Sequence, residues 1–391
     1  MCSRFGEDAH ATRSWRKYWP LDVQLQDTLP FLFSVLGIQE SSDPLVQMDP
    51  EIRRGRTLDA IKRILLSESL ERPLVLIFED LHWIDAETQS LLNVLADSIA
   101  SRPLLLLVNY RPEYQHEWTN KSYYTQLRLE PLAGERAEEM LTTLLSGDPE
   151  LAALKRKIIA RAEGNPFFIE EIVQALLAEG ALVRNGNVKV TRSPSELRLP
   201  ATVSGILASR IDRLAPGHKE LLQTVAAIGR ESPLDLIRQI RAGTETELER
   251  MLSDLQAAEF LHEKSVAGGI VYVFKHSLTL DVAYNSMLIE RRKSLHEKIA
   301  QVLESQHAEE LDDHVSELAR HYSRSGNVTK AIEYLERSGR QAIQRSAHYD
   351  AINDLTAAIE LSEKLPQGPE RSLRELSLRL ILGPALIAVK G

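Results

Sequence analysis

Residues 74–85 read Leu-Val-Leu-Ile-Phe-Glu-Asp-Leu-His-Trp-Ile-Asp, an unbroken apolar run that ends on two adjacent carboxylates, Glu79 and Asp80. A parallel strand that is buried on both faces is apolar throughout, without alternation. Ligands of an open α/β sheet bind beyond the carboxyl ends of its strands. We therefore expect residues 74–78 to form a parallel strand covered on both sides, with Glu79 and Asp80 at a ligand-binding edge.

The sequence around this run has the periodicity of a βαβ unit. Apolar residues recur at three- and four-residue spacing on either side of it, and a second apolar run follows. Asp85 and Thr88 stand where they can cap the helix that follows the first run. The predicted elements are helices at 28–38, 49–67 and 85–100 and strands at 74–78, 103–108 and 126–132.

Acidic residues at the end of a buried strand are typical of nucleotide sites. Such a site also needs a part that holds the phosphates, which this sequence does not contain. In a P-loop, backbone N–H groups and the lysine of Gly-Lys-Ser/Thr hold the phosphates. None of the 19 glycines in the chain is followed by lysine. The sequence therefore has the carboxylate half of an ATPase site without the half that holds the phosphates.

Composition limits the class of protein. The chain has 391 residues, which suggests two to four domains, and a net charge of −9. Proteins that bind nucleic acid usually present clustered Lys and Arg, so this acidic balance argues against such a partner. Cys2 is the only cysteine and cannot form an intrachain disulfide. No apolar run approaches the ~20 residues that span a bilayer. We expect a cytoplasmic protein without a membrane partner.

Downstream of the βαβ unit the pattern is mostly helical. Residues 134–179 are predicted to be helical with one interruption, at Gly164-Asn165-Pro166, and a hairpin on Asn185-Gly186 is predicted within 181–190. Three helical stretches and a β-ribbon then suggest a winged-helix module. Such modules either bind DNA or only pack, and the acidic background favours packing. These stretches are helices at 203–214, 218–228 and 246–257 and strands at 260–263 and 270–275, split by Gly268-Gly269.

Beyond residue 309 the sequence is helical and rich in alanine. Four residues have offsets that suit one tetratricopeptide-like helix pair: Ala319, Tyr322, Ala331 and Leu335. A second, shorter pair is expected at 340–365, followed by an apolar, helix-forming segment at 373–389. A helical array that ends this way exposes its last apolar face, so we expect the natural chain to be longer.

Several residues are candidates for chemistry, each with a simpler structural alternative. One of Glu79 and Asp80 would bind Mg²⁺ and the other would orient water, although acidic pairs also end strands as turn residues. Arg111, just past the second strand, could reach a phosphate with its donor fork, or belong to a surface turn. His82 and Asp85 have no further His or Cys at a suitable spacing, which argues against zinc.

Two candidates lie further along the chain. Gly164-Asn165-Pro166 could press backbone and a proline ring against a purine, but a tripeptide of this kind is also an ordinary turn. His276, at a strand-to-helix junction, could contact phosphate through a ring N–H or be a satisfied structural residue.

Five ordered blocks together resemble one family. They are residues 76–85, 108–114 (Val-Asn-Tyr-Arg-Pro-Glu-Tyr), 163–171 (Glu-Gly-Asn-Pro-Phe-Phe-Ile-Glu-Glu), 274–284 (Phe-Lys-His-Ser-Leu-Thr-Leu-Asp-Val-Ala-Tyr) and the alanine-rich helices. The resemblance is to the STAND-type ATPase module, a relative of AAA+ ATPases with an origin-recognition-like AAA domain, found in bacterial adenylate/guanylate cyclase-like signalling proteins with tetratricopeptide repeats.

The resemblance implies a fold and a set of roles. The fold would be a partial α/β P-loop NTPase core with a parallel sheet (1–132), an all-α lid with a small hairpin (133–197), a winged-helix module (198–305) and tetratricopeptide-like helices (306–391). By position, Glu79 and Asp80 resemble the Walker B pair and Arg111 the sensor-1 arginine. Gly164, Asn165 and Pro166 resemble the lid motif at adenine, and His276 the histidine that reads the β-phosphate of ADP.

ATP or ADP with Mg²⁺ would then be the ligands, and other proteins would bind the helical end. The chain departs from the pattern because the Walker A segment and a cyclase domain are absent, and we recognise no block of the pattern in the first twenty or so residues. The order Glu79-Asp80 also differs from the usual Asp-Glu, which leaves open which residue holds Mg²⁺. The sequence predicts a truncated ATPase regulatory module without activity of its own. The alternative is a non-enzymatic helical scaffold, and a DNA-binding regulator ranks last.

Overall fold

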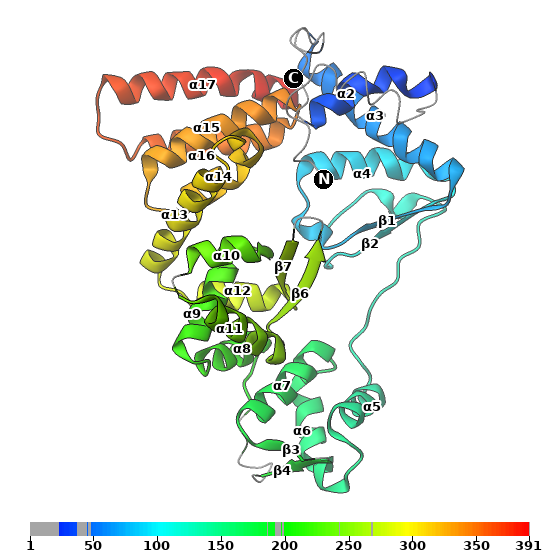
Figure 1. Ribbon diagram of the computed structural model, residues 1–391. Helices are drawn as coiled ribbons and strands as arrows, with labels where there is room; N and C mark the ends of the chain where they lie inside the picture. Colours follow the sequence, from blue (N-terminus) through cyan, green and yellow to red (C-terminus); the bar gives the residue numbers. More distant parts are fainter. Residues whose placement is uncertain are drawn as a thin grey trace. The chain divides into compact units, whose positions relative to one another are not determined.

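The computed structural model describes residues 23–36, 45, 48–185, 187–191, 197, 199–241, 243–266 and 269–390. Cys2 and the two turn glycines Gly186 and Gly268 lie outside the described residues. The chain forms two compact units (Figure 1). One contains the described residues up to Gln126 and those from His307 onward, and the other is Leu127–Gln306. Each unit is described below by itself.

The first unit opens with the predicted βαβ arrangement. Its elements are α2 (Leu29–Val35), α3 (Pro50–Glu71), β1 (Leu74–Phe78), α4 (Ala86–Ser98) and β2 (Leu104–Val108), with short 3-10 helices at Val23–Thr28, Leu81–Trp83 and Trp118–Asn120. β1 and β2 pair in parallel, with Leu74 opposite Leu104 and Phe78 opposite Val108. The parallel strand and its neighbours are thus confirmed. Asp49 caps α3, and Pro50 occupies the first turn, where it displaces no helical hydrogen bond.

Among the described residues of the first unit, only one face of this sheet is covered, which differs from the expectation of burial on both sides. Alternate residues of β1 and β2, among them Leu76 and Leu106, pack with Leu92 and Leu95 of α4. The intervening side chains face the other way and are exposed by half or more: Val75 55%, Ile77 61%, Leu105 56% and Leu107 50%.

The predicted strand at 126–132 is wrong. These residues form no regular structure, and Leu127 and Leu129 are exposed. Their apolar–polar alternation resembles a strand, but alternation does not provide the neighbouring strand that a ladder requires. The N–H of Leu132 instead donates to the carbonyl of Gly164 (2.8 Å).

The rest of the first unit is a stack of helices in which consecutive members pack against each other. They are α14 (Val315–Ser323), α15 (Val328–Gln344), α16 (His348–Ser362) and α17 (Pro369–Lys390), preceded by a 3-10 helix at Leu311–His314. The four residues predicted for the first pair are all buried between α14 and α15. The bounds of the second pair are wrong, because α15 continues to Gln344 and the next pair is α16 with α17.

The second unit contains helices and two small antiparallel sheets. Its elements are α5 (Gly134–Leu145), α6 (Ala152–Ala162), α7 (Pro166–Ala178), β3 (Leu182–Asn185), β4 (Asn187–Val190), α8 (Val203–Asp212), α9 (Pro216–Ile228), β5 (Glu231–Pro233), α10 (Leu234–Ile240), α11 (Glu245–Ala257), β6 (Leu261–Val266), β7 (Gly269–Phe274), α12 (Ser277–Asn285) and α13 (Ile289–Gln306), with a 3-10 helix at Pro149–Leu151.

The second unit agrees with the predictions in its hairpin and ribbon and differs in two places. β3 pairs with β4, and β6 pairs with β7. The helical region 134–179 has a second interruption, because Ser146 adopts a positive φ of 107° and ends α5. A third strand, β5, was not predicted, and it joins β7 to give the order β5-β7-β6.

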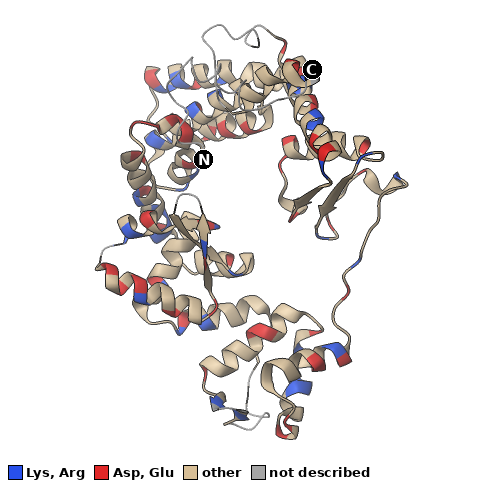
Figure 2. Cartoon of the chain, turned by 45° about the vertical axis from the view of Figure 1, so that its right-hand side comes forward, with Lys and Arg blue, Asp and Glu red and all other residues tan. Residues whose placement is uncertain are grey.

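Charge and hydropathy of the described helices agree with the composition. Acidic and basic side chains are interspersed along the helices of both units (Figure 2), and no described segment is uniformly basic. None of the described helices combines the length and apolarity needed to cross a membrane.

Candidate functional site

The two predicted carboxylates lie directly beyond β1. Glu79 is exposed, and Asp80 adopts the left-handed conformation, with φ 59° and ψ 45°. This conformation is uncommon outside glycine, although Asp and Asn tolerate it best. Among the described residues, neither carboxylate accepts a hydrogen bond. Both acids therefore stand at the carboxyl edge of the sheet with their oxygens available to a ligand.

Asn109, the residue that follows β2, holds Asp80 in this conformation. Its Oδ1 accepts a hydrogen bond from the backbone N–H of Asp80 (2.7 Å). Its carbonyl accepts one from Leu81 (3.0 Å), and its own N–H donates to the carbonyl of Phe78 (3.1 Å). Sequence reasoning missed this residue, and the available signal was an asparagine immediately after the second strand of a parallel pair.

Arg111 lies at the same edge, as the parallel topology predicts. Its guanidinium carbon is 5.6 Å from the centroid of the Trp83 ring, a cation–π distance. In the part of the chain that the structure describes, Arg111 forms no ion pair, and the residue is exposed. Its charge is therefore not neutralised by a neighbouring acid and can meet an anionic ligand.

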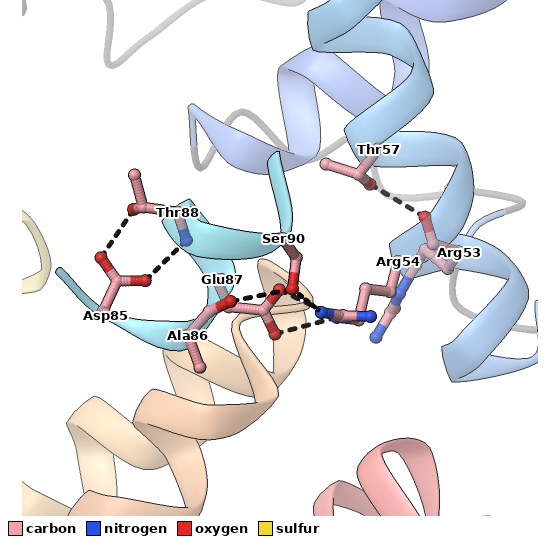
Figure 3. Close-up of polar contacts among 8 residues, drawn as sticks. All are labelled: Arg53, Arg54, Thr57, Asp85, Ala86, Glu87, Thr88 and Ser90. Atoms are coloured by element: carbon pink, nitrogen blue, oxygen red, sulfur yellow. Dashed lines mark hydrogen bonds and ion pairs between the residues drawn. The ribbon is translucent and has the colours of Figure 1, made fainter. Parts of the chain in front are cut away.

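Two neighbouring residues in the motif have structural roles. Asp85 caps α4: its Oδ1 accepts from the Thr88 N–H (2.8 Å) and its Oδ2 from the Thr88 hydroxyl (2.6 Å) (Figure 3). Burial alone would raise the pKa of Asp85, but these bonds outweigh it and lower the pKa. His82 packs against Trp83 with ring centroids 4.6 Å apart, and both its ring nitrogens are buried without a partner.

The carboxylate pair fits Mg²⁺ in a limited sense. Mg²⁺ is commonly held by one or two carboxylates, with waters and substrate phosphates filling the remaining positions. Glu79 and Asp80 could supply the carboxylates. No group of three or more His, Cys, Asp or Glu residues suited to a metal occurs in the described ranges, so the protein alone offers no complete set of ligands.

The Gly164-Asn165-Pro166 turn, in the second unit, is fully explained by its local structure. Gly164 has a φ of +77°, and a Cβ built there would lie 2.4 Å from the carbonyl oxygen of Leu132. Asn165 caps α7 by accepting from the N–H of Phe168 (3.1 Å), and Pro166 occupies the first turn. The turn therefore requires these residue types even without a ligand.

The structure nevertheless brings this turn next to His276. Phe167, the residue after Pro166, packs on the His276 ring with centroids 4.0 Å apart. Nε2 of His276 is buried without a partner. Burial, together with the positive charge of Lys275, lowers the pKa of His276 and favours the neutral ring. Sequence reasoning named His276 and the turn separately and did not predict the contact through Phe167.

Lys275 and a buried ion pair complete the surroundings of His276. Nζ of Lys275 is 2.8 Å from Glu259 and 4.0 Å from Glu170. Behind them, Glu171 of α7 pairs with Arg210 of α8, and both side chains are only 5% exposed. α7 is thus tied to α8 at the point where it meets His276.

Comparisons with known proteins show a family match over part of the chain. Residues 10–108 match the AAA ATPase domain family. An uncharacterized protein of Rhizobium meliloti (strain 1021) is 28% identical over 375 residues, which cover 95% of this chain and 35% of that protein. The chain therefore spans about a third of the length of this relative.

One solved structure shows a limited overall similarity. It is the crystal structure of a Signal Transduction ATPase with Numerous Domains (STAND) protein with a tetratricopeptide repeat sensor from Pyrococcus horikoshii. The sequence identity is 13%, and the match covers 94% of this chain and 54% of that chain. The TM-score is 0.45, which does not establish a common fold for the two chains.

Proposed function

We propose that this chain is the regulatory part of a nucleotide-dependent signalling switch of the STAND type, with ATP or ADP and Mg²⁺ as ligands. The observation that carries the proposal is the match of residues 10–108 to AAA ATPase domains, together with the acids and Arg111 at one sheet edge. In this proposal Glu79 and Asp80 act as a Walker B pair, of which one holds Mg²⁺ and the other orients water. Which acid does which stays open.

Arg111 would contact a phosphate of the same nucleotide. A guanidinium offers a planar donor fork that suits phosphate oxygens, and Arg111 has no competing acid among the described residues. Trp83 would hold the side chain near the edge through its ring. Asn109 would keep Asp80 fixed, so that no backbone ordering is needed when the ligand arrives.

The second unit, taken by itself, offers its own candidates for contacts to a base and a phosphate. The turn at Gly164-Asn165-Pro166 would border an adenine, and His276 would donate the N–H of its neutral ring to a phosphate oxygen. The Phe167–His276 contact supports a common role, because it brings the turn and the histidine side by side. We also propose that α9, α10, α11 and the sheet β5-β7-β6 form a winged-helix module that packs against protein rather than DNA.

We expect no ATPase activity from this polypeptide alone. The sequence has no Gly-Lys-Ser/Thr, so several phosphate contacts of a P-loop are missing. Hydrogen bonds to charged groups contribute about 1.5–3 kcal/mol each, and about 1.4 kcal/mol is tenfold in affinity. Losing even three such bonds weakens a micromolar site to millimolar or beyond. A link to a cyclase and a cytoplasmic location belong to the proposal as well.

Calorimetric titration with ADP and with ATP tests the nucleotide site. Marginal ADP binding is expected, weakened a further tenfold or so in Arg111→Ala because one charge-assisted contact is lost. Arg102→Ala is the matched control, since Arg102 precedes β2 at the opposite end of the strand. Equal loss in both variants would remove Arg111 from the site. Steady ATP turnover that vanishes in Glu79→Gln or Asp80→Asn would refute the expected inactivity.

A second candidate function is a non-enzymatic scaffold for other proteins. The observation that favours it is an exposed apolar stripe on α17 formed by Leu373, Leu376, Leu380 and Ile387. Their spacing of three, four and seven places them on one side of the helix. The scaffold predicts no heat and no thermal shift with either nucleotide, whereas the switch predicts both.

A further inference from the structure

A cavity of about 160 Å³ lies within the first unit. It is bordered by α2, α3, α4 and the turn 345–347 that joins α15 to α16. Part of its wall is apolar and comes from Leu58, Ile61 and Leu91. The cavity thus joins two stretches of sequence that are about 250 residues apart in the numbering.

One charged pair in the wall is already neutralised. Nε of Arg54 donates to both carboxylate oxygens of Glu87 (3.0 and 2.8 Å), and Nη2 donates to the hydroxyl of Ser90 (2.9 Å) (Figure 3). Burial raises the pKa of Glu87, although Arg54 opposes the shift. Because the acid and the guanidinium satisfy each other, neither leaves a net charge for a ligand to match.

The opposite wall has two features that the fold does not explain. Arg345 lines the cavity, and within the described residues no carboxylate pairs with it. Ser346 is 4% exposed, and its buried hydroxyl has no hydrogen-bond partner among the described residues. Ser346 also adopts a positive φ of 62°, a region that favours glycine. A buried hydroxyl without a partner costs stability unless something else binds it, and the half-buried guanidinium of Arg345 is free to pair with an anion.

We propose that this cavity binds a small monocarboxylate with a short apolar chain. Its carboxylate would bind Arg345 and accept a hydrogen bond from the Ser346 hydroxyl. Its chain would lie against Leu58, Ile61 and Leu91. The volume is about five times the ~30 Å³ that one water occupies in the liquid, which suits a ligand of roughly five to eight heavy atoms.

The charges of the cavity favour this class over two others. A cationic ligand would need an acid, and the only acid in the wall, Glu87, is engaged by Arg54. A phosphate dianion would need more than one unpaired cation and would leave the apolar wall unused. A single negative charge matches the single unpaired guanidinium of Arg345.

Titration of the full chain with 3-methylbutanoate, measured by calorimetry and by ligand-observed NMR, tests the proposal. Its uncharged isostere, 3-methylbutanamide, is the matched probe. We expect millimolar binding of the acid and about tenfold weaker binding of the amide. Arg345→Gln should weaken the acid about tenfold and leave the amide unchanged. Arg379→Gln, on α17, is the control and should bind the acid like the unaltered chain.

Ser346→Gly separates binding from folding. Glycine accepts the positive φ, so this variant should unfold at the same or a higher temperature while it binds the acid several-fold more weakly. The proposal is overturned if the unaltered chain shows no binding of the acid up to about 10 mM, a weak limit for a specific site. Equal binding of acid and amide, or full binding by Arg345→Gln, overturns it too.

Discussion

Replacing Arg210 by methionine should destabilise the second unit and leave the first unit unchanged. The guanidinium pairs with Glu171, donates to the carbonyl of Ala258 (2.6 Å) and lies 4.6 Å from the centroid of the Phe260 ring. Both charged side chains are only 5% exposed. Removal of the arginine therefore leaves a buried carboxylate and a partly buried carbonyl without their donor.

The expected loss is large. Removing one partner of a buried ion pair costs about 3–5 kcal/mol. With a urea dependence of about 2 kcal/mol per M, the unfolding midpoint of the second unit should fall by roughly 1.5–2.5 M. Adding Glu171→Gln to Arg210→Met removes the unpaired carboxylate charge. The double variant should therefore lose less free energy of unfolding than the two single variants lose in sum.

The chain offers a clean way to follow the two units separately. All four tryptophans, Trp15, Trp19, Trp83 and Trp118, lie outside Leu127–Gln306. Tryptophan fluorescence therefore reports on the first unit, while far-UV circular dichroism reports on both. Arg210→Met should shift only the dichroism transition. A shift of less than about 0.5 M, or an equal shift in fluorescence, would show that the pair does not stabilise this unit selectively.

Two further predictions concern the second unit. Gly164→Ala should cost more than about 2 kcal/mol, because its Cβ would meet the carbonyl of Leu132 at a positive φ. Gly180→Ala, with a positive φ but open space around it, should cost only about 1 kcal/mol, and equal losses would contradict the clash. The His276 ring should titrate by NMR below its ordinary pKa of 6.5, and Phe167→Ala should return the midpoint toward it. The folded pKa of His276 is lower than the unfolded one. The neutral ring therefore contributes stability above pH 6.5, and this contribution is lost as the pH falls from 6.5 through the folded pKa. An unchanged midpoint in Phe167→Ala would show that burial by Phe167 does not cause the lowered pKa.

Local patterns in the sequence predicted the elements that depend on local structure. The apolar runs at β1 and β2 and the periodicity of α3 and α4 identify these elements without tertiary information. The segment 126–132 alternates like a strand, yet a strand exists only beside another strand, and none lies there. β5 is three residues long and ends on Pro233, so no pattern could have marked it.

Some residues of the candidate sites are predictable from topology, and others depend on a backbone conformation that the sequence does not show. Parallel topology alone predicts that Glu79, Asp80 and Arg111 meet at one edge, because carboxyl ends of parallel strands lie together. The clamp by Asn109 depends on a left-handed backbone at Asp80, which the residue type permits but does not reveal. The strained Ser346 is still less visible, since serine gives no sequence signal for a positive φ.

One face of the β1–β2 sheet is left exposed by the described residues of the first unit, whereas the sequence predicts cover on both faces. A strand with one wet face normally alternates apolar and polar residues, whereas Val75, Ile77, Leu105 and Leu107 are all apolar and at least half exposed. Exposed apolar area costs about 25 cal/mol for each Å² that could be buried, so four such side chains gathered on one face favour a covering partner. The unalternating apolar sequence of these strands thus suits burial on both faces, whereas the described residues bury only one. An apolar surface is therefore the expected chemistry of whatever packs on this face.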